Sequence, residues 1–178
     1  ENDRTPPFPG VRTVARVLVA YGSKMGGTAG IAQRIADTLR GRGMDVSLRP
    51  AGEVGGVDDY DAILVGSAIY TGRWHPEAVR LVHRIADAGV QSPVWLFHSG
   101  PLDVEGTLEA QPLPRSVTRW TDRLNMQEVK TFGGRLPADP KGFVARAMAK
   151  TMAGDWRNLP AVAVWAEGVA DTLGVEGT

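Results

Sequence analysis

Apolar residues along this chain gather in short runs that indicate five strands. The run VARVLVAY at 14–21 becomes almost continuously apolar toward its end, which is typical of a strand buried on both faces. By contrast, the run at 44–48 alternates weakly, which favours a position nearer the sheet edge. The predicted strands cover 14–21, 44–48, 62–66, 94–97 and 129–136.

Helical periodicity fills most of the intervals between these strands. Ile31, Ile35 and Leu39 recur at steps of four, and Pro76 stands where a helix tolerates a missing N–H. The predicted helices cover 30–42, a segment opened by Pro76 and reaching Ala86, part of 115–125, 143–152 and 160–173. Strands that alternate with helices predict an α/β fold, a doubly wound five-stranded parallel sheet with helices on both faces.

Length and composition then limit the classes of protein. A chain of 178 residues suits one domain. We expect residues 1–12, which are polar and rich in proline, to form a flexible arm, and residues 13–178 to form the domain. The net charge is zero, no apolar run could span a bilayer, and cysteine is absent. These features argue against nucleic-acid binding, a transmembrane helix and a metal site, and they favour a cytoplasmic protein.

The segment after the first strand has the composition of an anion-binding loop. It runs Ser23-Lys24-Met25-Gly26-Gly27-Thr28 between a buried strand and an amphipathic helix. Backbone N–H groups, two hydroxyls and the positive end of the helix can converge there on one phosphate. The spacing fits neither a Walker loop nor a dinucleotide G-x-G-x-x-G motif. A glycine-rich turn that binds nothing is the alternative.

The spacing Ser23-x-x-Gly26-x-Thr28 resembles the phosphate loop of flavodoxin-like FMN proteins. Within that superfamily the chain is most similar to the branch that contains menaquinone-dependent protoporphyrinogen IX dehydrogenase. It shares with that branch a basic residue at Lys24 and a second motif, GSAIYTGRWH at 66–75. The resemblance covers about residues 14–173. It implies a flavodoxin-like fold, and it implies that the loop from Ser23 to Thr28 holds the phosphate of FMN.

The same resemblance places two further loops beside the flavin ring. One wall would come from Ala68, Ile69, Tyr70, Thr71, Gly72 and Trp74, and the other from Ser99, Gly100, Pro101 and Leu102. Ordinary packing at the sheet edge is the alternative for Tyr70 and Trp74. His75 could reach the ring or a substrate, and the alternative for it is a hydrogen bond at the start of the following helix. The second wall lacks the aromatic residue that flanks the ring in many flavodoxins. This absence leaves a deazaflavin coenzyme as an alternative to FMN. No catalytic residue is assigned.

The resemblance also implies a redox function. One hypothesis is an oxidoreductase that passes electrons from a small-molecule donor to a quinone. The competing hypothesis is a non-catalytic carrier that serves a redox partner protein, although a neutral chain lacks the net charge that steers such carriers. The segment 143–152 carries Arg146 and Lys150 on one face. It would contact the inner face of the membrane peripherally, or pack against the sheet or a second copy in a homodimer.

Overall fold

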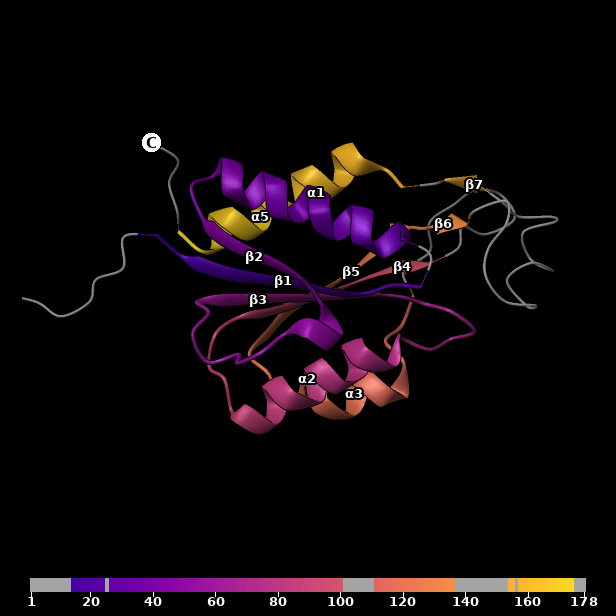
Figure 1. Cartoon of the computed structure of the whole chain (residues 1–178), viewed down its shortest axis with the longest axis horizontal. Coiled ribbons are helices and arrows are strands. Elements are labelled where there is room, and N and C mark those ends of the chain that lie inside the picture. Colours follow the sequence, from indigo (N-terminus) through magenta and orange to yellow (C-terminus); the bar gives the residue numbers. More distant parts are fainter. Residues whose placement is uncertain (1–13, 25, 101–110, 137–153, 156, 175–178) are drawn as a thin grey trace, which may run out of the picture.

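The computed structural model describes residues 14–24, 26–100, 111–136, 154–155 and 157–174. Its centre is a five-stranded sheet in the order β2-β1-β3-β4-β5, with all neighbouring pairs parallel (Figure 1). The strands are β1 (Arg16–Gly22), β2 (Asp45–Pro50), β3 (Ala62–Ala68), β4 (Val94–Gly100) and β5 (Met126–Gly133). The prediction of a doubly wound parallel sheet is therefore confirmed, as is the edge position of the second strand.

Helices cover both faces of the sheet, as the alternating pattern predicted. Helices α1 and α5 lie together on one face, and α2 and α3 lie together on the other (Figure 1). The helical segments are α1 (Gly27–Gly41), η1 (Ala51–Glu53), α2 (Pro76–Ala88), α3 (Arg115–Thr121) and α5 (Leu159–Thr172). Pro76 opens α2 as predicted. No helix in the described part of the chain is long and apolar enough to cross a membrane.

Each face of the sheet has its own hydrophobic core. Along β1, Val17 and Val19 pack under α1 and α5, whereas Leu18 and Ala20 pack on the α2 side. This division follows from the two-residue period of a strand, which points successive side chains to opposite faces. All four side chains are fully buried. Burying a Val or Leu side chain contributes about 1.5–3 kcal/mol, so the two cores fix the sheet that positions the loops.

Two of the central strands run further than their apolar patterns predicted. Strand β3 continues to Ala68, and β4 continues through Ser99 to Gly100, where a loop had been expected from Ser99 onward. The reason is hydrogen bonding on both sides, because Ala68 pairs with Ser99 and Gly100 pairs with Gly133. Neighbouring strands therefore hold turn-forming residues in extended conformation.

The strand predicted at 129–136 is divided in the structure. Strand β5 begins earlier, at Met126, and ends at Gly133, while β6 (Arg135–Leu136) pairs antiparallel with β7 (Gly154–Asp155) in a separate two-stranded sheet. Gly134 marks the break, and its N–H donates to the carbonyl of Gly100. The helix predicted at 143–152 and the arm predicted at 1–12 lie outside the described residues. Both stay predictions.

Candidate functional site

The loops predicted to form a site start from neighbouring strand ends. Gly22 at the end of β1 pairs with Ser67 of β3, and Ala68 pairs with Ser99 of β4. Carboxyl ends of parallel strands share one edge of the sheet, where ligands of such folds sit. The structure therefore brings the first loop and the two predicted walls to the same edge.

The first loop is shaped by its own hydrogen bonds and by one glycine. The Ser23 hydroxyl accepts a hydrogen bond from the Gly26 N–H at 3.0 Å, which closes a tight turn. Gly26 has a φ of +78°, in the left-handed region that favours glycine. It precedes the first residue of α1, and no side chain caps this helix start. Lys24 is exposed. The loop thus presents the N-terminus of α1 together with the ammonium group of Lys24. Met25 lies outside the described residues.

Gly22 and His75 bring the first loop against the start of α2. A Cβ on Gly22 would lie 2.7 Å from the Cβ of His75, so only glycine permits this approach. His75 is the residue before α2, where its Nδ1 accepts from the Glu77 N–H and its own N–H donates to the Ser67 hydroxyl at 2.8 Å. The helix-start role, which the sequence left as an alternative, is the one that the structure shows for His75.

Thr28 lies deeper in the protein than a residue that contacts phosphate only at the surface. Its side chain is fully buried, and its Oγ1 lies 2.9 Å from the Oγ of Ser99 in β4, which is itself 5% exposed. Either hydroxyl can be the donor in this pair. Thr28 therefore ties the first turn of α1 to the strand that begins the second predicted wall.

The first predicted wall forms a tight turn that projects from the sheet edge. Tyr70 and Arg73 exchange two backbone hydrogen bonds, of 2.9 and 3.0 Å. Thr71 and Gly72 between them have φ values of 49° and 72°, which match the two positive φ values of a type I′ turn. The turn is anchored at Ile69, whose N–H donates to the carbonyl of Ser99. Its tip is exposed, whereas Ile69 and Tyr70 are half-buried.

Trp74, the last residue of the first predicted wall, lies in the core and takes part in a series of buried hydrogen bonds. Its side chain is 4% exposed, and its indole N–H donates to Nδ1 of His98 at 3.2 Å. Because tryptophan can only donate, Nδ1 of His98 carries no proton, and Nε2 donates to the Thr131 hydroxyl at 2.9 Å. Burial of His98 lowers its pKa from 6.5 to about 4. The imidazole is therefore neutral, and it joins the first wall to β4 and β5.

Arg157 is a charged neighbour of the first loop that the sequence did not reveal. Its guanidinium lies directly against Gly30 in the first turn of α1, where a Cβ would collide with it. Asp155 holds the Arg157 side chain through Nε at 2.8 Å and Nη2 at 2.6 Å, and this carboxylate raises the pKa of Arg157. No local periodicity marks such a contact, because it joins the segment after β7 to a helix far earlier in the chain.

The structure describes most of the predicted site residues. Ser23, Lys24, Gly26 and Gly27 lie in or beside the first loop, and the residues from Ala68 to Gly72 form the exposed turn and its base. Ser99 and Gly100 end β4 in buried positions. Met25, Pro101 and Leu102 lie outside the described residues. Contact of any of these residues with a cofactor stays a prediction.

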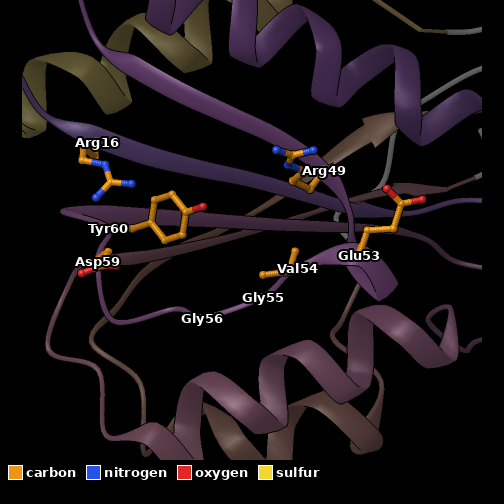
Figure 2. Close-up of a pocket in the computed structure, with 8 residues that line it drawn as sticks. All are labelled: Arg16, Arg49, Glu53, Val54, Gly55, Gly56, Asp59 and Tyr60. Atoms are coloured by element: carbon orange, nitrogen blue, oxygen red, sulfur yellow. The ribbon is translucent and has the colours of Figure 1, made fainter.

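A groove of about 450 Å³ lies beside the edge strand β2 and contains none of the predicted residues. Arg16 and Tyr60 lie toward one end, and Arg49 and Glu53 toward the other (Figure 2). The backbone of Gly55 and Gly56 lines the groove between them. Each end of the groove has one basic and one acidic residue, with Asp59 near Arg16 (Figure 2). The Arg16 guanidinium lies 5.6 Å from the centre of the Tyr60 ring. In the described ranges, no three acidic or histidine side chains are grouped to hold a metal ion.

Comparison with known proteins identifies relatives in both sequence and structure. The sequence profile of the family described as Flavodoxin domain matches residues 18–155. No curated protein has a matching sequence.

Three solved structures illustrate the likeness in fold. A flavodoxin from the domain Archaea has a TM-score of 0.61 at 13% identity, with 89% of this chain and 99% of that chain covered. Flavodoxin 2 from Bacillus cereus has a TM-score of 0.57 at 21% identity, with the same two coverages. A flavoprotein in complex with FMN from Lactobacillus acidophilus has a TM-score of 0.50 at 16% identity, with 66% of this chain and 93% of that chain covered.

Proposed function

The chain belongs to the flavodoxin domain family, and we propose that it binds FMN at the carboxyl edge of its sheet and serves in electron transfer. The first loop would hold the phosphate, and the turn from Ala68 to Gly72 together with the end of β4 would flank the ring. FMN when bound supplies the redox chemistry, while the protein binds and orients it.

The uncapped start of α1 is the observation that carries this proposal. Gly26 turns the chain in a left-handed conformation, and no side chain occupies the helix N-terminus that follows. A Cβ placed on Gly26 would meet no atom within 4 Å, so the space outside the loop is open. Backbone N–H groups that lack intrahelical partners attract an anion, and the exposed Lys24 adds positive charge nearby. These groups fit a phosphate.

The residues around the ring position act mainly by holding the backbone firmly. The turn at 70–73 is closed by its own hydrogen bonds, and its base is fixed to β4 through Ile69 and Ser99. Behind it, Trp74 is held by His98 in the core. A rigid turn with a small, exposed tip can lie along a flat ring without losing conformational freedom on binding.

More specifically, we propose that the protein is an oxidoreductase that passes electrons from a small-molecule donor to a quinone. The resemblance of the motif at 66–75 supports this hypothesis. Arg73 is exposed at the turn, which would suit an anionic substrate beside the ring. A carrier that serves a protein partner is the alternative. Quinone reduction by the loaded protein alone would support the enzyme, whereas electron exchange only with an added redox protein would support the carrier.

Absorbance of the purified protein, followed by titration of the cofactor-free protein with FMN, tests the cofactor directly. We expect a flavin spectrum and saturable binding that Gly26→Val weakens. A deazaflavin spectrum would leave the assignment of the phosphate loop standing and would change the identity of the coenzyme from FMN to a deazaflavin. If neither coenzyme binds, the proposed function is wrong.

A further inference from the structure

The outer surface of α2 and α3 collects positive charge, although the whole chain is neutral. The two helices lie side by side on one face of the sheet (Figure 1). The exposed arginines on α2 and on the segment from α3 to its following turn are Arg80, Arg84, Arg115, Arg119 and Arg123. The same segments carry only three carboxylates, from Glu77, Asp87 and Asp122. We call this surface the α2–α3 basic face.

The ring of Trp120 in α3 contacts side chains of α2, of α3 and of the turn that follows α3. The imidazole of His83 stacks on its ring, with the ring centres 4.0 Å apart. The guanidinium groups of Arg119 and Arg123 lie 6.0 and 5.9 Å from the ring centre, within the range of cation–π attraction. The indole therefore holds two long cationic side chains near the surface, which reduces the entropy that they would lose when a partner binds.

The carboxylates of the face are partly used within it. Asp87 accepts from Nε2 of His83 at 2.8 Å and from Nη1 of Arg123 at 3.1 Å, so its charge is already compensated. Across the described part of the chain, Arg80, Arg115 and Arg119 form no ion pair with any carboxylate. These three guanidinium groups keep their charge for a ligand in solution.

Two arginines of α3 carry like charges on the same side of the helix. Arg115 and Arg119 lie four residues apart in α3, which brings like charges one turn apart, and Arg123 follows the end of the helix. Such pairs destabilise a helix. No acidic residue lies in the first turn of α3 to offset them.

We propose that the α2–α3 basic face docks a protein partner whose surface is rich in carboxylates. Arginine and tryptophan are the residues that most often dominate protein–protein contacts, and arginine binds carboxylates in a bidentate fork. A protein fits better than a nucleic acid, because the carboxylates of Glu77 and Asp122 interrupt the face and would repel a continuous phosphate backbone. Local charge steers a partner even when the net charge is zero, because screening at about 0.15 M salt limits the range over which each charge acts to about 8 Å.

Docking at this face goes beyond flavin binding and can be measured without the flavin. The probe is an acidic [2Fe–2S] ferredoxin, and its affinity is measured for the full chain with and without FMN. The test variant is R115E/R119E. The matched control is R34E/R49E, which makes the same change in net charge at two exposed arginines on other elements. A neutral variant, R115Q/R119Q, covers the case in which charge reversal disturbs folding, and circular dichroism monitors all three.

We expect the wild-type protein to bind the ferredoxin at about 0.01 M salt and to release it near 1 M, where the Debye length falls to about 3 Å. R115E/R119E should weaken binding at least about tenfold, R115Q/R119Q should weaken it less, and R34E/R49E should stay close to wild type. Equal losses in test and control variants would overturn the proposal, as would binding of duplex DNA in place of ferredoxin or binding of neither. These measurements also use the cofactor-free chain. They therefore test docking at the basic face even if the protein does not bind FMN.

Discussion

The hydroxyls of Thr28 and Ser99 lie 2.9 Å apart in the protein interior, although 71 residues separate them in the chain. One belongs to the first turn of α1 and the other to the end of β4, so the pair joins the predicted phosphate loop to a predicted wall of the ring site. This contact gives Thr28 a structural role beside the predicted contact with phosphate.

Replacing Thr28 by Val should therefore destabilise the protein. The substitution keeps the shape and leaves the buried Ser99 hydroxyl without its partner, at a cost of about 1–3 kcal/mol in the free energy of unfolding. The double variant T28V/S99A should recover part of this loss, because both polar groups are then gone. Urea unfolding of the two single variants and the double variant measures the coupling. Strictly additive effects would show that the two hydroxyls do not interact.

The same variants separate the tether from the phosphate contact. Ser99→Ala removes the tether and leaves the predicted phosphate loop unchanged, whereas Thr28→Val removes the tether and the hydroxyl nearest the helix start. A phosphate contact by Thr28 predicts that FMN binds more weakly to Thr28→Val than to Ser99→Ala, by about 1.5–3 kcal/mol for a charge-assisted hydrogen bond. Titration with riboflavin, which lacks the phosphate, is the control and should not distinguish the variants.

Gly26 should tolerate side chains according to backbone conformation and not according to size. Its φ of +78° is accessible to Asn and strongly disfavoured for Val, while its surroundings are open. Gly26→Asn should keep most of the FMN affinity. Gly26→Val should lose at least about 1–2 kcal/mol of it by changing the loop conformation. Fluorescence titration with FMN measures both, and equal affinities would show that the loop conformation does not matter for binding.

Protein stability should fall as the pH drops below about 6.5, because His98 is buried as a neutral imidazole. Its folded-state pKa is about 4, so between these values the unfolded chain binds a proton that the folded chain excludes. The loss should approach about 3 kcal/mol near pH 4, since each pKa unit corresponds to about 1.36 kcal/mol. Urea unfolding between pH 7 and pH 4 measures it. His98→Asn, which does not titrate in this range, should show a shallower decline.

Gly66 should not accept even one methyl group. A Cβ at this position would overlap the ring of Phe97 on the neighbouring strand, deep in the core. Gly66→Ala should therefore destabilise the protein by about 1–3 kcal/mol through overpacking. Gly55→Ala is the matched control, because its Cβ would meet no atom within 4 Å. A thermal unfolding midpoint for Gly66→Ala equal to that of the control would contradict the observed packing.

The order of the elements could be read from the sequence, because it depends on local patterns. Apolar runs and four-residue steps identified the five strands and the helices α1, α2, α3 and α5. Strand ends were less predictable. Ser99 and Gly100 have the character of turn residues, and only hydrogen bonds from β3 and β5 keep them extended.

The contacts that organise the site were decided by tertiary structure alone. Trp74 and His98, like Thr28 and Ser99, meet because parallel strands bring their ends to one edge, and nothing in the intervening sequence records the distance. The charges followed the same rule. A count over the chain gives zero, but folding places α2 beside α3 and gathers their arginines on one face. Local propensity therefore determined the elements, and the packing of elements distant in sequence determined which side chains act together.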